Sequence, residues 1–203
     1  INAGPEASDL FREFVKETGY PCTLTLMGLG AYPSSDPQFL GMLGMHGTYE
    51  ANLAMHGCDV MINIGARFDD RVTGLLSAFS PGSKKIHVDI DPSSINKNVS
   101  VDVPVVGDAA TVLAQMLEVW RRKKYSADKP ALEAWWRQIN LWRQRDCLGF
   151  RQTGDVIRPQ HAIRRLFEKT AERECFISTE VGQHQMWAAQ YYGFDKPNRW
   201  LLS

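Results

Sequence analysis

Residues able to bind a phosphate follow the apolar segment 59–64, which has the composition of a buried strand. Gly65 and Ala66 are small enough to let another group approach the backbone closely, and Arg67 carries a planar guanidinium that can clamp a phosphate. Gly28 and Gly30 occupy the same position after an earlier apolar segment. Neither place has the Gly-x-Gly-x-x-Gly pattern of dinucleotide-binding loops. These residues indicate a phosphate-bearing ligand at strand ends without identifying it.

Two carboxylates flank Ile90 at the end of another apolar segment. Asp89 and Asp91 are alternate residues, so in a strand their side chains point to the same side. A carboxylate at this place commonly accepts hydrogen bonds from the ribose hydroxyls of a nucleotide. Asp91 also precedes Pro92 and on that ground opens a turn. Position alone leaves a ribose contact by Asp89 and a purely structural turn as open alternatives.

The histidines nearby supply no catalytic group. His46 lies between Gly44 and Gly47, and a single histidine of this kind is more often packed or exposed than a ligand. We interpret His56 in the same structural way. The sequence has no His-x-x-x-His pair of a metal site and no serine or cysteine in a nucleophile elbow. We therefore assign no catalytic acid, base, nucleophile or metal ligand in this chain.

Asp69 and Asp70 are adjacent carboxylates that could in principle act as a pair. They stand between Arg67 and Arg71, however, and opposite charges this close together form ion pairs. An ion-paired network is the simpler interpretation of this run.

Strands and helices alternate in the first 122 residues. Strands are predicted at 22–27, 59–64, 85–90 and 103–106. Helices are predicted at 9–18 with Ser8 as N-cap, at 47–57, and at 109–121 with Asp108 as N-cap. This alternation is typical of an α/β fold with a doubly wound, mostly parallel sheet and flanking helices. Ligands of such sheets bind outside the carboxyl ends of the strands.

The alternation of strands and helices gives way to a polar, basic stretch after residue 121. The basic run 121–124 and the polar residues after it indicate a solvated linker, although four basic residues could also form an anion patch. A tryptophan-rich helical face follows, which we expect to clamp onto a neighbouring domain. A second unit begins near residue 157, with a helix starting at Pro159 and a strand at 175–179. The glycine turn at Gly182 then opens a helix whose N-terminus could bind an anion.

The composition narrows the class of partner. Lysine plus arginine and aspartate plus glutamate both number 23, so no net field attracts nucleic acid or an acidic membrane. The four cysteines are far apart and suggest buried thiols in a reducing compartment. No apolar run approaches the ~20 residues of a membrane span, and no signal peptide is evident. We expect a soluble, cytoplasmic protein, and the two ends of the chain suggest a fragment of a larger polypeptide.

Four segments of the chain resemble those of a known enzyme family. They are LMGLGAYPSSDPQFLGMLGMHGTYEAN, NIGARFDDRVTG, KIHVDIDPSSINKN and STEVGQHQMWAAQYYGF. In this order and spacing they resemble the large, catalytic subunit of acetolactate synthase, also called acetohydroxyacid synthase, over most of the chain. The resemblance implies a Rossmann-like FAD-binding middle domain at 1–122 without its first strand. It further implies a linker and Trp-rich helix at 123–155, and the start of the thiamine diphosphate-binding C-terminal domain at 156–203.

The resemblance also implies which residues bind which cofactor. Those matching contacts to FAD are Thr25, Leu26, Met27, Leu43, Gly44, Met45, His46, Gly65, Ala66, Arg67, Asp69, Val72, Asp89, Ile90, Asp108, Ala109, Gln185 and Met186. Those matching contacts to thiamine diphosphate are Val181, Gly182, Gln183 and His184. Asp70 and Arg71 match the mouth of the substrate channel. The catalytic glutamate and the Mg²⁺ ligands of the family belong to parts outside this chain.

The activity implied for the parent enzyme is decarboxylative condensation of two pyruvates, or of pyruvate with 2-oxobutyrate, in branched-chain amino acid biosynthesis. A homodimer or homotetramer with a small regulatory subunit is implied as well, and the fragment alone is expected to be inactive. Two alternatives remain: another thiamine diphosphate-dependent decarboxylase or carboligase on the same fold, and a nucleotide-binding module without catalysis.

Overall fold

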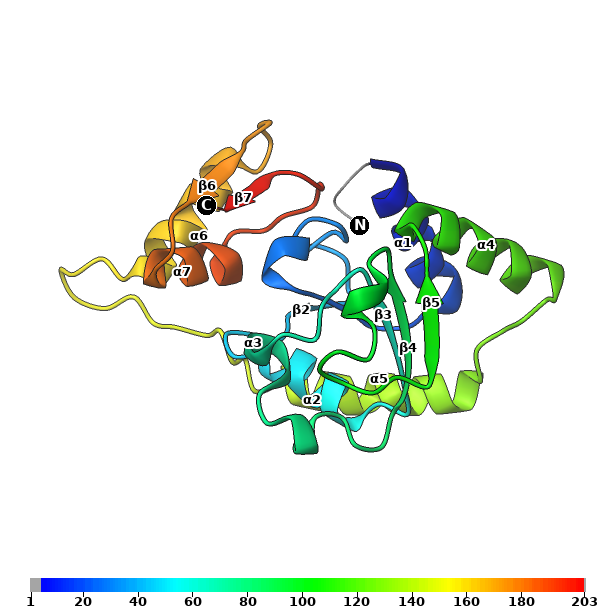
Figure 1. Ribbon diagram of the computed structural model, residues 1–203. Coiled ribbons are helices and arrows are strands. Elements are labelled where there is room, and N and C mark those ends of the chain that lie inside the picture. The colour runs from blue at the N-terminus through cyan, green and yellow to red at the C-terminus, as the bar shows by residue number, and fades with distance from the viewer. Residues whose placement is uncertain (1–4, 203) are drawn as a thin grey trace.

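The computed structural model describes residues 5–202 and contains short strands alternating with helices (Figure 1). The predicted domain ends at residues 1 and 203 lie outside the described residues. The strands are β1 (Cys22–Leu24), β2 (Phe39–Met42), β3 (Val60–Ile64), β4 (Lys84–Asp89), β5 (Val103–Val106), β6 (Ile177–Thr179) and β7 (Trp200–Leu202). The helices are α1 (Pro5–Thr18), α2 (Tyr49–Gly57), α3 (Asp70–Thr73), α4 (Ala109–Arg122), α5 (Lys129–Arg143), α6 (Pro159–Thr170) and α7 (Gln183–Tyr191).

All the strand pairs in the described part of the chain are parallel. β1 pairs with β2, β4 lies between β3 and β5, and β6 pairs with β7. The predicted α/β class with parallel strands is therefore confirmed, although hydrogen bonding divides the strands into three groups. Parallel pairing brings the carboxyl ends of neighbouring strands to one edge, so the segments that follow β3, β4 and β5 emerge together.

Helices flank the strands β1 to β5 on two sides. α1 packs against α4 on one side, and α2 packs against α5 on the other (Figure 1). α4 buries Val112, Leu113 and Leu117, which recur at helical spacing, and begins where the Asp108 carboxylate accepts a hydrogen bond from the Thr111 amide at 3.0 Å. The predicted flanking helices and the predicted N-cap Asp108 are therefore both present.

The Trp-rich helix packs against the first domain. Ile139 of α5 is fully buried, and the partly buried Trp135, Trp136 and Trp142 surround the same small core. The Trp136 indole Nε1 donates a hydrogen bond to the Gly19 carbonyl at 2.9 Å. The predicted clamp is confirmed, because the aromatic face is used for packing.

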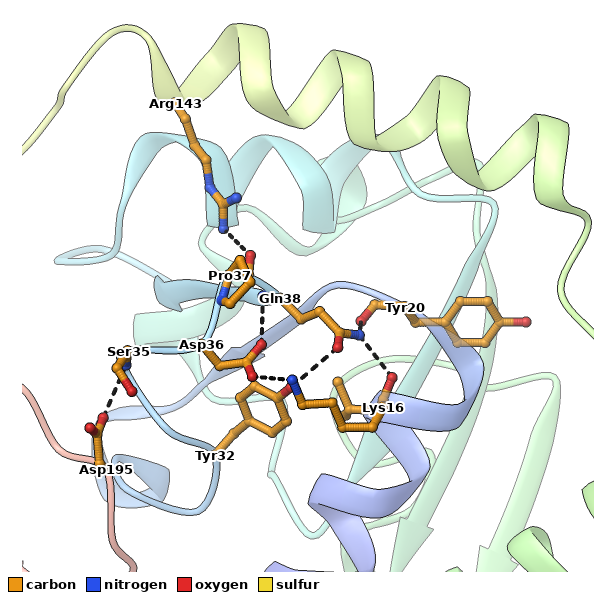
Figure 2. Close-up of polar contacts among 10 residues, drawn as sticks. Lys16, Tyr20, Tyr32, Ser35, Asp36, Pro37, Gln38, Arg143 and Asp195 are labelled. Carbon is orange, nitrogen blue, oxygen red and sulfur yellow. Dashed lines mark hydrogen bonds and ion pairs between the residues drawn. The ribbon is translucent and has the colours of Figure 1, made fainter.

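A polar cluster fixes the loop that leads into β2 (Figure 2). Asp36 accepts hydrogen bonds from Lys16 of α1 and from the Gln38 amide, the latter at 2.9 Å. The Gln38 side chain in turn donates to the Tyr20 carbonyl at 3.0 Å. Arg143 at the end of α5 donates to the Pro37 carbonyl at 2.8 Å. The start of β2 is thus tied to α1 and to α5.

The second unit lies beside the first and contacts the loop after β1 (Figure 1). Arg12 of α1 donates hydrogen bonds to the carbonyls of Gly30 and Asp195, both at 3.0 Å. The Asp195 carboxylate accepts from the Ser34 hydroxyl at 2.9 Å. Gly30 has φ +90°, and a Cβ there would stand 2.2 Å from the Lys196 carbonyl oxygen. This glycine therefore permits the close contact of the two units.

Several sequence-based boundaries were wrong. Ser8 does not cap a helix, because α1 already begins at Pro5. The first strand ends at Leu24 and passes into a short 3₁₀ helix, Leu26–Gly28. β2 was not predicted at all, since Gly41 interrupts its apolar pattern. Of the four cysteines only Cys22 is buried, and all are free.

Candidate functional site

The loop after β2 is fixed by one asparagine. The Asn52 side chain of α2 accepts a hydrogen bond from the Gly44 amide at 2.8 Å and donates to the Gly44 carbonyl at 2.9 Å. Gly44 has φ +93°, a conformation that residues with a Cβ rarely adopt. The predicted FAD residues Met45 and His46 extend from this point and are exposed. Local hydrogen bonding therefore holds the loop in place and presents these two side chains outward.

This loop contacts the segment that follows β3. The Met45 amide donates to the Arg71 carbonyl at 2.8 Å, and a Cβ at Gly44 would stand only 2.4 Å from the same carbonyl oxygen. A hollow of about 370 Å³ opens here and is lined in part by Gly44, Met45, Asp70 and Arg71. The structure thus brings the predicted substrate-channel residues Asp70 and Arg71 next to the predicted FAD contacts Gly44 and Met45.

Gly65 turns the chain at the carboxyl end of β3. It has φ +64°, and its amide donates to the Val88 carbonyl of β4 at 2.7 Å. The Asn63 side chain donates to the Ala66 carbonyl at 2.6 Å, which orders the next residue. Arg67 then extends outward with 73% of its side chain exposed, paired with Asp69 at 3.2 Å. Its guanidinium is accessible to an anionic ligand.

The ion-paired interpretation of the acidic run agrees with the geometry. Arg67 pairs with Asp69, and Arg71 lies 3.9 Å from Asp70. These side chains are largely exposed, so the pairs contribute little to stability and leave the charges available.

The nucleotide end of the predicted site lies beyond β4. Asp89 is buried, and its Oδ1 accepts a hydrogen bond from the Asp91 amide at 2.9 Å. The neighbouring Ile90 is 70% exposed and offers an apolar surface. The Asp91 carboxylate accepts from the Ser93 amide at 2.9 Å, so Asp91 opens the turn as its position before Pro92 indicated.

Asp108 serves mainly as the N-cap of α4. The Thr111 amide donates to its carboxylate and thereby lowers the pKa of Asp108. Ala109 follows as the first residue of the helix. Any nucleotide contact at this position is therefore made beside a helix N-terminus, where the backbone amides favour negative charge.

The remaining predicted flavin residues lie in the segments after β1, β2 and β3 and in the helix α7. Thr25 precedes the 3₁₀ helix that contains Leu26 and Met27, and Leu43 donates its amide to the Leu24 carbonyl at 3.2 Å. Val72 lies in α3, while Gln185 is buried in α7 beside Met186. α7 reaches the β2 loop directly, because the Gln190 amide group donates to the His46 carbonyl at 2.9 Å.

The predicted thiamine diphosphate residues form an exposed turn at the start of α7. Val181 is 78% exposed, and Gln183 is the first residue of the helix. A Cβ at Gly182 would stand 2.9 Å from the His184 ring, so the glycine leaves this ring in place. Backbone amides at a helix N-terminus suit a diphosphate.

Met45 and His46 face two different hollows. Met45 lines the 370 Å³ hollow, whereas His46 lines a second one of about 500 Å³ together with Arg164 and Gln190 at the junction with the second unit. Gly65, Arg67 and Asp89 line neither hollow, and they lie instead along the strand ends. The structure therefore brings together the loops after β1, β2 and β3, but it does not enclose all predicted contacts in one pocket.

Two polar side chains beside the predicted site residues were not singled out from the sequence. Asn52 holds Gly44, and His87 is fully buried two residues before Asp89 on the same strand. The spacing of His87 and Asp89 could have revealed the second, because alternate strand residues share a face. No sequence pattern pointed to Asn52, since its partner is a backbone group.

The described residues fit a flavin nucleotide by their chemistry. Exposed methionines supply apolar contact for a ring, an exposed arginine can bind a diphosphate, and a carboxylate stands at the end of the central strand. Within residues 5–202, no group of three or more histidine, cysteine, aspartate or glutamate side chains could hold a metal ion. No helix in this range is long and apolar enough to cross a membrane.

Comparison with known proteins identifies the protein family to which the chain belongs. The thiamine pyrophosphate enzyme central domain matches residues 2–116, which is more than half of the chain. The chain therefore belongs to the thiamine pyrophosphate enzyme family, through its central domain.

Within this family, the chain is similar to individual acetolactate synthases. The chain is 47% identical over 198 residues to the acetolactate synthase large subunit of Haemophilus influenzae, covering 98% of the chain and 34% of that protein. It is also 47% identical over 192 residues to the acetolactate synthase isozyme 3 large subunit of Escherichia coli, covering 95% and 33%. Identity to the chloroplastic acetolactate synthase 1 of Oryza sativa is 44% over 204 residues, covering 100% and 31%. The chain thus spans about a third of the length of these relatives.

Proposed function

We propose that this chain is the FAD-binding middle region, followed by the start of the third domain, of an acetolactate synthase catalytic subunit. The observation that carries the proposal is the 44–47% identity to acetolactate synthases along 95–100% of the chain. The parent enzyme would condense two pyruvates, or pyruvate with 2-oxobutyrate, with loss of carbon dioxide. The product is an acetohydroxyacid for branched-chain amino acid biosynthesis.

In this proposal the flavin ring packs on the apolar side chains after β1 and β2, with Met27 and Met45 as contacts. Arg67 binds the diphosphate, and Asp89 accepts hydrogen bonds from the ribose. The exposure of Met27 at 66%, of Met45 at 62% and of the Arg67 side chain at 73% supports these roles, because a ligand could reach each side chain from solvent. The condensation has no net redox change, so the flavin shapes the site between domains.

The turn at Val181–His184 would contact thiamine diphosphate, which supplies a carbanion sink when bound. Asp70 and Arg71 would form part of the substrate channel, beside the hollow next to Met45. Mg²⁺ and the catalytic glutamate would come from parts of the polypeptide outside this chain. The assembly would be a homodimer or homotetramer with a small regulatory subunit, as the term large subunit in the names of the relatives supports.

The flavin site can be tested through Arg67. Replacing it with alanine in the full-length protein removes a charge-assisted hydrogen bond worth roughly 1.5 to 3 kcal/mol, so the Kd for FAD rises by about one to two decades. Isothermal titration calorimetry with FAD measures this change. Arg122→Ala is the matched control, because Arg122 is 63% exposed and also pairs with a carboxylate, Glu118, at 3.3 Å. Equal FAD affinity in the two variants would refute the diphosphate contact.

A further inference from the structure

The central strand β4 carries three polar side chains on one buried face. Lys85, His87 and Asp89 alternate along the strand and are 8%, 0% and 8% exposed. The Lys85 ammonium donates to the carbonyls of Ser80 and Ser83 at 2.9 and 3.1 Å, which satisfies it. The three residues run from the amino end of β4 to its carboxyl end, where the nucleotide is proposed to bind.

His87 is the anomaly in this row. Neither of its ring nitrogens has a partner that meets the full geometry of a hydrogen bond within residues 5–202, although the Ala66 carbonyl is close enough to raise the pKa of the ring. The ring packs edge-on against Phe68 with centroids 5.0 Å apart. Burying an unpaired polar group costs free energy, so an apolar residue would suit this environment better if packing were its only role.

The carboxylate of Asp89 is the charged group that His87 faces. His87 Nε2 lies 3.7 Å from Asp89 Oδ2, while Asp89 Oδ1 is already held by the Asp91 amide. Oδ2 is therefore the oxygen that we assign to a ligand, and His87 Nε2 is the ring nitrogen that faces it. Burial lowers the pKa of His87, and the Asp89 carboxylate and the Ala66 carbonyl offset part of this effect. A neutral ring can still present an N–H toward Oδ2.

We propose that His87 is a positioning residue of the nucleotide site, which fixes Asp89 Oδ2 so that it accepts a hydrogen bond from a ribose hydroxyl. The inference rests on the proposed FAD function and adds to it a residue that does not touch the ligand. His87 is buried and does not contact the ligand. A short movement of its ring shortens the distance between His87 Nε2 and Asp89 Oδ2 from 3.7 Å to that of a hydrogen bond.

The pair His87→Gln and His87→Met tests this role in the full-length protein. Glutamine and methionine have similar length, but only glutamine places an N–H near the position of Nε2. Titration with FAD should give a Kd raised about three- to tenfold in His87→Met and close to wild type in His87→Gln. Thermal unfolding without FAD provides the second readout. His87→Met should not lower the melting temperature, because it removes an unpaired buried polar group.

A double-mutant cycle with Asp89→Asn completes the test, since residues acting as a unit are not additive. If His87 acts through Asp89, His87→Met should have no further effect on FAD affinity in the Asp89→Asn background. Unchanged FAD affinity in His87→Met, or additive effects in the cycle, would overturn the positioning role while leaving the proposed function intact. Absence of FAD binding by the wild-type full-length protein would overturn both.

Discussion

Gly44 provides a quantitative test of how the β2 loop is positioned. Its φ of +93° costs a residue with a Cβ about 1 to 2 kcal/mol. An alanine Cβ would in addition stand 2.4 Å from the Arg71 carbonyl oxygen and 3.1 Å from the Val72 Cα, both backbone atoms. The segment after β3 must then move, which weakens the Met45–Arg71 hydrogen bond and adds about 1 to 2 kcal/mol. We expect Gly44→Ala to lower the free energy of unfolding by about 2 to 4 kcal/mol.

Gly154→Ala is the matched control. Gly154 has φ +69°, and a Cβ there would meet no atom within 4 Å. This variant therefore bears only the conformational cost, about 1 to 2 kcal/mol. Urea titrations followed by tryptophan fluorescence give both free energies, and amide hydrogen exchange at Met45 should accelerate only in Gly44→Ala. If the two variants lose the same stability and Met45 exchanges at the wild-type rate, the contact between the two loops is refuted.

Two further predictions concern stability. Burial lowers the pKa of His87, so as the pH falls below about 6.5 the unfolded chain takes up a proton before the folded chain does, and the free energy of unfolding should decrease. Urea titrations at several pH values should show this decrease in the wild-type protein but not in His87→Gln. Parallel pH dependences of the two proteins would contradict the prediction. The Thr48 hydroxyl accepts a hydrogen bond from the Ala51 amide at 3.2 Å and donates one to the Leu40 carbonyl, so Thr48→Val should lower the free energy of unfolding by about 1 to 3 kcal/mol. The control Thr153→Val, at an exposed residue of the linker, should change the urea midpoint of unfolding little. Equal midpoints for the two variants would contradict the role of Thr48 as a cap.

The sequence predicted the fold where local patterns are strong. α4 has an N-cap, a regular apolar stripe and a predicted start that the structure confirms at Ala109. β5 was predicted with its observed bounds, Val103–Val106. β2 escaped prediction because Gly41 interrupts its apolar pattern, and because its conformation depends on the partner strand β1 and on Lys16 and Arg143, which hold the preceding loop from distant parts of the sequence. Tertiary context decides such short strands.

The candidate site shows the same division. Glycines and an arginine after strands pointed to a ligand at strand ends, and the parallel sheet places Gly65, Arg67 and Asp89 at such ends. Contacts that depend on distant backbone groups were not predictable, as with Asn52 holding Gly44. The individual cofactor roles came from resemblance and stay predictions until they are measured.

The most direct test is turnover of pyruvate by the full-length protein with thiamine diphosphate and Mg²⁺, with and without FAD. We expect carbon dioxide release with formation of acetolactate, dependent on FAD, and no such activity from the 203-residue chain alone. Acetaldehyde as the product would instead indicate a decarboxylase of the same family. Acetolactate formation by the 203-residue chain alone would contradict the assignment of the catalytic glutamate and Mg²⁺ ligands to other parts of the polypeptide.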